Sequence, residues 1–304
     1  MLFSVVEMFQ AENPKPEPSD AAETVPCFGK INLFLEIQDR RPDGFHNLGT
    51  LFHTIDCGDR LSAEPAPTLT LEGAEGITAS TDDNLIIKAA KLLRETFPDR
   101  VKADAGMRFS LVKILPTGAG LGGGSSNAAA ALQLCNRIWR MGLTDSELLP
   151  VAARLGADVP FFLFGGCYFG EGKGEILHPA PSPYPFHIVV GTPPCRVETG
   201  WAYDQLDPAR KKEWARFKAL YFTYFEDWEF YQVLRNDFDA PMRRHFPEIE
   251  TLSNRMGDFG PIKTLLSGSG ASVFSLFREK AAAERCLEEI GVNCRFSCLA
   301  EFAT

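Results

Sequence analysis

The sequence predicts an α+β protein built from two packed domains. The chain has 304 residues, of which 45% are hydrophobic. These hydrophobic residues are more than the core of one typical domain contains. Segments with strand and helix patterns are mixed in both halves, and the proline-rich segment HPAPSPYPF, at 178–186, lies between them. We therefore expect a disordered N-terminal tail over 1–26, a first domain over 27–180 and a second domain over 181–304.

The first predicted strand is KINLFLEI, at 30–37, because its side chains alternate in character. One face carries Ile31, Leu33, Leu35 and Ile37, and the other carries Lys30, Asn32, Phe34 and Glu36. This pattern predicts a half-buried strand whose second face is mostly polar, with Lys30 on a solvated surface.

The elements that follow are predicted from periodicity, capping residues and turn residues. A turn is expected at 40–47, and a capping box of Thr144 and Glu147 opens a helix that Gly156 closes. A helix is also expected to begin near Ser125 or Ser126. The remaining predicted strands are 48–64, 68–73, 107–115, those around 167–177, 187–193 and those within 261–277, and the remaining helices are 81–97, the aromatic-rich stretch 214–234 and 279–291.

Charge and cysteine content exclude several classes of protein. A formal net charge of −9 argues against a nucleic-acid or anionic-membrane surface, which needs a basic footprint. The eight cysteines form no CxxC pair, which predicts reduced thiols and a cytoplasmic protein, and Cys294 and Cys298 lack a second pair for a metal site. The N-terminus lacks a basic n-region, and no apolar stretch is long enough to span a membrane.

The segment LPTGAGLGGGSSNAAAAL, at 115–132, contains the most informative pattern in the chain. It joins a predicted strand to a predicted helix through five glycines, Gly118, Gly120, Gly122, Gly123 and Gly124. Such a loop exposes several backbone N–H groups at a helix N-terminus, where the helix dipole adds positive potential. The segment therefore predicts a phosphate-binding site.

Two familiar phosphate loops fit this segment poorly. A P-loop requires a lysine after its last glycine, and no lysine occurs between Pro116 and Leu132. The spacing GxGxxG of a dinucleotide-binding loop is present, but the acid that would bind a ribose, Asp145, lies at the start of a helix instead of at the end of a strand. A flexible linker fits less well still, because a periodic strand and a periodic helix flank the segment tightly.

The loop closely resembles that of the GHMP kinases, whose pattern is Pro-x-x-x-Gly-Leu-Gly-x-Ser-Ser-Ala. This chain has an extra glycine and carries Asn127 where the pattern has alanine. Three further segments, GKINLFLEIQDRRPDGFHNLGTLFHTIDCGD, LGADVPFFL and LLSGSGASVFSLF, resemble the branch of that superfamily that phosphorylates a cytidine diphosphate derivative of methylerythritol in the non-mevalonate isoprenoid pathway. The resemblance implies a ribosomal-protein-S5-like N-terminal domain and a ferredoxin-like C-terminal domain that closes the cleft.

The resemblance also implies the catalytic residues. Asp158 corresponds to the general base, and Lys30 corresponds to a lysine that pairs with this aspartate and polarises the acceptor hydroxyl. Without the resemblance, an aspartate two residues before a proline predicts only a turn or helix cap. ATP is the expected cofactor, with Mg²⁺ bound mainly by its phosphates and water. The implied ATP-binding residues are Pro116, Thr117, Gly118, Ala119, Gly120, Leu121, Gly122, Gly123, Gly124, Ser125, Ser126, Asn84, Leu85 and Lys113.

For the cytidine end of the substrate, the resemblance implies stacking between two aromatic rings and hydrogen bonds to the base edge. Phe45 stands where the family usually has tyrosine, so the ring is kept and the hydroxyl is lost. For Phe45 and Tyr203 the alternative is ordinary core packing. The implied substrate-binding residues are Asn32, Phe45, His46, Thr199, Tyr203, Gly268, Ser269 and Gly270.

Other functions stay open at this point. A kinase of the same fold could use another alcohol, such as homoserine or mevalonate, although the DGFH segment disfavours this. A catalytically silent nucleotide-binding protein is disfavoured because both Lys30 and Asp158 are present. A dinucleotide-dependent dehydrogenase ranks third. The expected partners are the small-molecule substrate and ATP, with no nucleic acid and no membrane, and we expect a monomer or weak homodimer.

Overall fold

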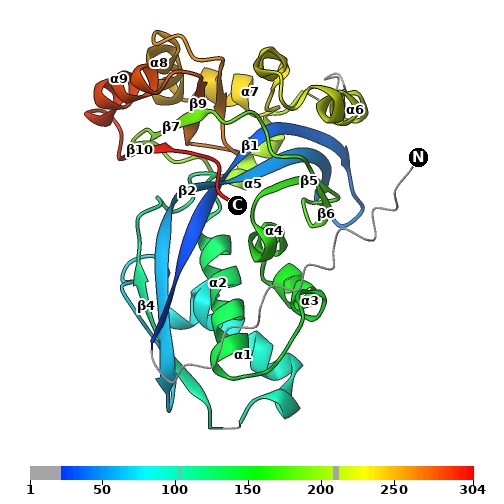
Figure 1. Ribbon diagram of the computed structural model, residues 1–304, viewed down its shortest axis with the longest axis vertical. Helices are drawn as coiled ribbons and strands as arrows, with labels where there is room; N and C mark the ends of the chain where they lie inside the picture. The colour runs from blue at the N-terminus through cyan, green and yellow to red at the C-terminus, as the bar shows by residue number, and fades with distance from the viewer. Residues whose placement is uncertain (1–21, 103, 208–211) are drawn as a thin grey trace.

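The computed structural model describes residues 22–102, 104–207 and 212–304, and these residues form two sheets with helices packed on them (Figure 1). The first sheet has the strand order β3-β4-β2-β5-β6, with β1 paired to β2. The second has the order β10-β7-β9-β8. The first sheet comprises β1 (Glu23–Arg40), β2 (His46–Ala66), β3 (Leu69–Glu72), β4 (Gly106–Val112), β5 (Cys167–Glu171) and β6 (Ile176–Pro179), and the second comprises β7 (His187–Thr192), β8 (Lys263–Leu266), β9 (Val273–Phe277) and β10 (Phe296–Ala300).

The helices divide between the two sheets. Helices α1 to α4 pack around the lower half of the first sheet in Figure 1, with α2 as their centre, and α8 and α9 cover the second sheet. Short 3₁₀ turns lie at Thr81–Asp83, Pro98–Arg100 and Trp228–Val233. The α-helices are α1 (Leu85–Thr96), α2 (Gly123–Ile138), α3 (Asp145–Leu155), α4 (Val159–Phe164), α5 (Thr199–Asp204), α6 (Trp214–Tyr224), α7 (Asp239–His245), α8 (Pro247–Gly257) and α9 (Lys280–Gly291).

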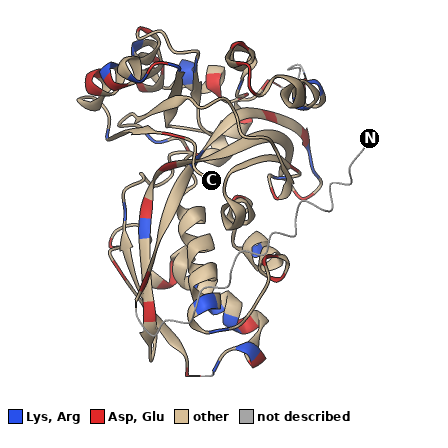
Figure 2. Cartoon of the chain, viewed as in Figure 1, with Lys and Arg blue, Asp and Glu red and all other residues tan. Residues whose placement is uncertain are grey.

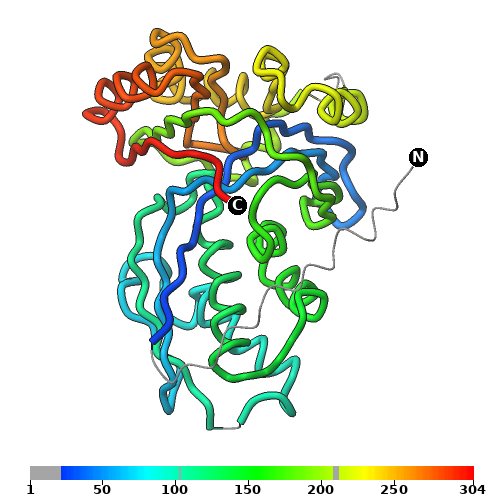
Figure 3. Tube along the Cα trace, viewed as in Figure 1, coloured from blue at the N-terminus to red at the C-terminus, as the bar shows by residue number. Residues whose placement is uncertain are grey.

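The two halves are joined by more than one crossing of the chain. The segment after β6 carries the chain into β7, and the C-terminal residues return from β10 to lie beside β2 (Figure 3). Phe302 forms a β-bridge with Ile55, and the Ala303 N–H donates to the Thr54 carbonyl at 3.0 Å. The end of the chain therefore fixes the second sheet against the first.

Several predicted elements are confirmed with their caps. Helix α1 begins after Asn84, whose side chain accepts a hydrogen bond from the Ile86 N–H, and α3 has the predicted capping box of Thr144 and Glu147. Helix α2 begins at Gly123, two to three residues before the predicted start at Ser125 or Ser126. The aromatic-rich stretch is not one helix, because α6 ends at Tyr224 and a 3₁₀ turn follows.

The predicted solvated face of the first strand is wrong. Lys30 is 4% exposed, Asn32 is 2% exposed, and Phe34 and Glu36 are also buried. The Phe34 ring stacks on Phe217 of α6 with their centroids 4.0 Å apart, while Glu36 forms an ion pair with Arg235. This face is buried because elements distant in the sequence cover it, which alternation in one strand cannot reveal.

The predicted tail is too long at its C-terminal end. Glu23 to Pro26 already belong to β1, where Val25 pairs with Leu61 of β2. Residues 1–21 of the predicted tail lie outside the described residues. In the described part of the chain, none of the helices has the length and hydropathy that crossing a lipid bilayer requires.

Charged side chains of both signs are interspersed over both halves, whereas α2 is almost free of charge (Figure 2). Its residues Ser126 to Leu132 are buried, as are Leu134 and Cys135. The buried alanines of α2 let α1 and the strands approach it closely. The N-terminal end of α2 is therefore held rigidly against the first sheet, and this end carries the predicted phosphate loop.

Candidate active site

A cleft of about 1080 Å³ lies where the two halves meet, and it gathers nearly all of the predicted site residues. Two of them, Leu121 and Ser126, do not line it, and both are buried. The Leu121 carbonyl accepts a hydrogen bond from the Lys30 N–H at 2.9 Å, and the Ser126 N–H donates to the Gly122 carbonyl at 2.9 Å. These two residues therefore fix the loop from behind. The predicted residues that do line the cleft are Lys30, Asn32, Phe45, His46, Asn84, Leu85, Lys113, Pro116, Thr117, Gly118, Ala119, Gly120, Gly122, Gly123, Gly124, Ser125, Asp158, Thr199, Tyr203, Gly268, Ser269 and Gly270.

The glycine-rich loop requires glycine for both conformation and space. Gly118, Gly120 and Gly122 have φ values of 64°, 81° and 72°, in the left-handed region that other residues rarely adopt. A Cβ on Gly120 would overlap the Ser267 carbonyl oxygen, and one on Gly122 would lie 2.7 Å from the Phe162 ring. The loop is therefore packed against the second half of the molecule at Gly120 and against α4 of the first half at Gly122.

The carbonyl groups of the loop are used by the protein, whereas its amides are not. The Ala119 carbonyl accepts from the Ser272 N–H at 3.1 Å, and the Gly120 carbonyl accepts from the Ser267 hydroxyl at 2.9 Å. Within the described residues, no group accepts a hydrogen bond from the backbone N–H groups of 117–125. These amides, together with the N-terminal dipole of α2, provide an anion site.

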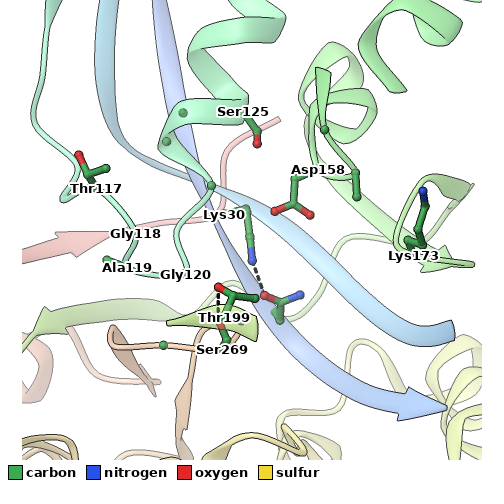
Figure 4. A pocket seen from close by; sticks show the side chains of 18 of the residues that line it. Lys30, Thr117, Gly118, Ala119, Gly120, Ser125, Asp158, Lys173, Thr199 and Ser269 are labelled. Atoms are coloured by element: carbon green, nitrogen blue, oxygen red, sulfur yellow. Dashed lines mark hydrogen bonds between the residues drawn. The ribbon is translucent and has the colours of Figure 1, made fainter. Parts of the chain in front are cut away.

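Lys30 extends from β1 into this cleft (Figure 4). Its ammonium donates to the Asn32 Oδ1 at 2.5 Å, the Asn32 Nδ2 donates to the Thr50 hydroxyl at 2.9 Å, and that hydroxyl donates to the Phe34 carbonyl at 2.7 Å. This chain of hydrogen bonds fixes the lysine side chain. Burial lowers the pKa of Lys30, and the nearby Asp158 opposes that shift.

Asp158 precedes α4, and its carboxylate faces the same space as the Lys30 ammonium and the Ser125 hydroxyl (Figure 4). Asp158 lies in a turn at the N-cap position of α4, as the alternative predicts, but its side chain makes no capping hydrogen bond to the helix. In the described part of the chain Lys30 and Asp158 form no close ion pair, although the Asp158 charge acts on the lysine, so their pairing stays a prediction. The Asp158 carboxylate and the Lys30 ammonium face a shared space.

On the opposite side of the loop, Asn84 and Lys113 have structural partners. The Asn84 Oδ1 accepts from the Ile86 N–H at 3.0 Å as the cap of α1. The Lys113 ammonium lies 2.6 Å from the Asp59 carboxylate, which is buried and also accepts from the Ile114 and Leu115 N–H groups. Asp59, which sequence reasoning missed, anchors the chain where β4 leads into the glycine-rich loop.

The aromatic residues lie at the other end of the cleft. Phe45 is 58% exposed, so core packing is wrong for it, and the Lys173 ammonium lies 4.7 Å from its ring centroid. Tyr203 packs edge-on against Phe238 and stacks on His46, with centroids 4.9 Å apart and ring planes inclined by 11°. Tyr203 therefore both packs against the core and faces the cleft.

The SGSG segment forms the wall contributed by the second half. The Thr199 and Ser269 hydroxyls are hydrogen-bonded at 3.1 Å. Asn236, also missed by sequence reasoning, donates from its Nδ2 to the Leu266 and Gly268 carbonyls, each at 2.8 Å. Asn236 and Thr50 are recognisable only once tertiary contacts are known, because no local motif marks either residue.

Comparison with known proteins identifies the class of protein. The description "GHMP kinases N terminal domain" matches residues 84–166, and "GHMP kinases C terminal" matches residues 227–294. A homoserine kinase from Cytophaga hutchinsonii, at 16% identity and a TM-score of 0.74, shares the fold over 95% of this chain and 96% of its own. The fold is that of a GHMP kinase, and the predicted two-domain architecture of that type is confirmed.

More similar relatives define the family within this class. A 4-diphosphocytidyl-2-C-methyl-D-erythritol kinase from Prosthecochloris aestuarii is 36% identical over 90% of this chain and 95% of its own length, and one from Hahella chejuensis is 38% identical over 86% and 87%. A crystal structure of 4-(cytidine 5'-diphospho)-2C-methyl-D-erythritol kinase has a TM-score of 0.77 and 31% identity, and the match covers 93% of this chain and 100% of that structure. The chain belongs to the family of 4-diphosphocytidyl-2-C-methyl-D-erythritol kinases.

Proposed function

We propose that this kinase transfers the γ-phosphoryl group of ATP to the 2-hydroxyl of 4-diphosphocytidyl-2-C-methyl-D-erythritol. The observation that carries the proposal is the arrangement of three groups around one space. The unused amides of 117–125 lie on one side, and the Asp158 carboxylate and the Lys30 ammonium face the same space. The names of the relatives support the choice of substrate.

Phosphoryl transfer to an alcohol requires in-line positioning, removal of the hydroxyl proton and neutralisation of developing charge. Asp158 is suited to accept the proton because its carboxylate does not cap α4. Lys30 is held by Asn32 in a buried position, where an ammonium acts strongly on an acceptor oxygen. In this proposal the acceptor hydroxyl lies between these two side chains.

The ATP phosphates are assigned to the loop from Pro116 to Ser125, and the nucleoside is assigned to the side of Asn84, Leu85 and Lys113. Magnesium fits the groups present, since the cleft offers the Asp158 carboxylate, the Ser125 hydroxyl and the Asn127 amide, whose Oδ1 is buried without a partner. Magnesium bound with the nucleotide would neutralise phosphate charge.

The cytidine end of the substrate is assigned to Phe45, His46 and Tyr203, with Thr199 as a polar contact. The exposed Phe45 ring can stack on a base without further change. In the present arrangement His46 covers a face of Tyr203, so a base stacked on that face requires His46 to move. The assignment also includes Gly268, Ser269 and Gly270 beside the phosphate loop.

Three further properties belong to the proposal. We place the protein in the cytoplasm as a monomer or weak homodimer without a nucleic-acid partner. We assign the first domain to 23–180, from the start of β1, and the second to 181–304. The chain passes from β6 in the first sheet to β7 in the second between Pro179 and His187, which supports this boundary.

The direct test is to incubate the protein with ATP, Mg²⁺ and 4-diphosphocytidyl-2-C-methyl-D-erythritol and to follow the product by phosphorus NMR. The expected result is a new phosphomonoester on the 2-hydroxyl and stoichiometric ADP. Homoserine and mevalonate serve as control alcohols in the same assay. Faster transfer to either control, or ATP binding without transfer to any alcohol, would contradict the proposal.

A further inference from the structure

Asn127 has a polar group that the protein itself does not use. The residue is 4% exposed and lines the cleft, yet its Oδ1 accepts no hydrogen bond from the described residues. A buried carbonyl oxygen without a donor costs about 1–3 kcal/mol. The residues of α2 that follow it, 128–132, are four alanines and a leucine, so this position could be filled by an apolar side chain at no such cost.

Helix geometry directs this side chain towards the anion site. Side chains of an α-helix lean towards its N-terminus and cover the residues three and four positions earlier. For Asn127 these residues are Gly124 and Gly123, both of which line the cleft and neither of which has a side chain. Asn127 therefore lines the cleft together with these two glycines, at the end of α2 that carries the unused amides.

The unpartnered atom is an acceptor, which restricts what can satisfy it. Phosphate oxygens cannot, because they too are acceptors. A hard cation or one of its bound waters can, and Mg²⁺ prefers oxygen ligands and keeps several waters when bound to phosphates. Lys113 pairs with Asp59 and Lys30 donates to Asn32, and although each ammonium has further N–H groups, neither donates to the Asn127 Oδ1 in this structure.

We propose that the Asn127 Oδ1 binds the magnesium that accompanies the triphosphate, either directly or through one of its water ligands. The inference rests on the proposed function, because it takes ATP as the occupant of the loop. It gives Asn127 a role in metal binding that is separate from the proton transfer assigned to Asp158.

The test measures metal binding and does not depend on turnover. Mn²⁺ replaces Mg²⁺, and electron paramagnetic resonance reports free Mn²⁺ in the presence of the full chain and a non-hydrolysable ATP analogue. We expect Asn127→Ala to weaken Mn²⁺ binding about 10-fold, the effect typical of losing a group that supports a metal ligand. The affinity for the analogue without metal should change less than about twofold, because no phosphate contact is lost.

Two further variants make the result specific. Asn127→Asp keeps the acceptor and adds charge, so it should bind Mn²⁺ at least as tightly as the parent. Gln133→Ala alters a residue of α2 outside the cleft, whose side chain bonds the Leu163 carbonyl, and should leave Mn²⁺ binding unchanged. Alanine at 127 matches the superfamily pattern and its helical neighbours, so the variant should fold, which thermal unfolding checks.

Two results would overturn the inference. One is parent-like Mn²⁺ binding by Asn127→Ala. The other is an equal loss of analogue affinity with and without metal, which would show that the amide nitrogen contacts phosphate. If the parent protein transfers phosphate and Asn127→Ala behaves like the parent, only the inference fails. If the parent binds no nucleotide at all, the proposed function fails first.

Discussion

At the scale of single residues, the site depends on how Lys30 is held. A lysine buried to this extent loses hydration, and burial lowers its pKa. Its ammonium is oriented by Asn32, which is in turn oriented by Thr50. The Thr50 hydroxyl touches neither the loop nor Asp158 through a hydrogen bond, so it acts on Lys30 only through Asn32.

Replacing Thr50 with valine tests this chain of hydrogen bonds. The substitution keeps the shape but removes the hydroxyl, so Asn32 loses an acceptor and Lys30 is less well positioned. We expect kcat to fall about 10-fold, with the KM for ATP nearly unchanged, because misplacement affects the transferred group more than nucleotide binding. Steady-state kinetics of both substrates provide the measurement.

The matched control for that prediction is Thr264→Val. The Thr264 hydroxyl is also hydrogen-bonded to another hydroxyl, that of Ser275, at 2.7 Å. Thr264 lies in β8, outside the cleft. Its variant should lose some stability and keep its kcat. Equal kcat values for both variants would refute a positioning role for Thr50.

At the scale of elements, the glycine-rich loop depends on its contact with the segment after β8. Ser267 donates to the Gly120 carbonyl, and a side chain on Gly120 would collide with the Ser267 carbonyl. The N-terminal side of the loop is fixed by Asp59, which accepts from two backbone N–H groups after β4. The loop conformation is therefore set by both halves of the molecule.

Gly120→Ala and Gly124→Ala form a matched pair that tests this contact. At Gly120 an alanine has to adopt a positive φ, and its Cβ collides with backbone atoms. At Gly124 the Cβ contacts only Leu85 Cδ1, at 3.8 Å. We expect Gly120→Ala to lower the free energy of unfolding by about 1–3 kcal/mol and to weaken ATP binding at least tenfold. Gly124→Ala should not lower the free energy of unfolding, since alanine favours a helix.

Chemical denaturation and calorimetric ATP titration measure the two effects. The prediction concerns the difference between the two variants, so each variant serves as the control for the quality of the other preparation. If Gly120→Ala binds ATP as the parent does, the close packing of the loop against the segment after β8 has no functional consequence.

At the scale of the whole molecule, the two sheets are fixed together by the C-terminal residues. His53 of β2 is fully buried, its Nδ1 interacts with the Thr54 carbonyl at 2.7 Å, and its ring packs on Phe302. The Nε2 of His53 has no partner among the described residues. Burial lowers the pKa of His53 from 6.5 to about 4, so the folded state keeps the ring neutral.

This shift predicts a pH dependence of folding. Between pH 6.5 and about 4 the unfolded chain binds a proton that the folded protein does not. The free energy of unfolding should therefore fall as the pH falls through this window, by roughly 3 kcal/mol in total from this residue. His53→Gln, which cannot titrate, should show a shallower fall in urea denaturation over the same range. Parallel curves for parent and variant would contradict the low pKa.

Sequence reasoning reached those features that are encoded locally. The strand, the glycine-rich loop and the caps of α1 and α3 follow from residues close together in the chain, and most of the predicted site residues line one cleft. Burial of Lys30 could not be predicted, because α6 and the loop that cover its strand are distant in sequence. Asp59 and Asn236 were missed for the same reason, since their partners are backbone groups brought close only by folding. The short helix α4 was not predicted, because it consists of consecutive apolar residues without helical periodicity.

The central claim is that Asp158 accepts the proton of the acceptor alcohol at a site where ATP is held by other residues. The most direct measurement is single-turnover phosphoryl transfer by Asp158→Asn, with ATP binding measured on the same preparation. The account predicts ATP binding within a few-fold of the parent and a rate of transfer reduced by about 10²- to 10⁴-fold. A transfer rate close to that of the parent, with ATP bound normally, would contradict it.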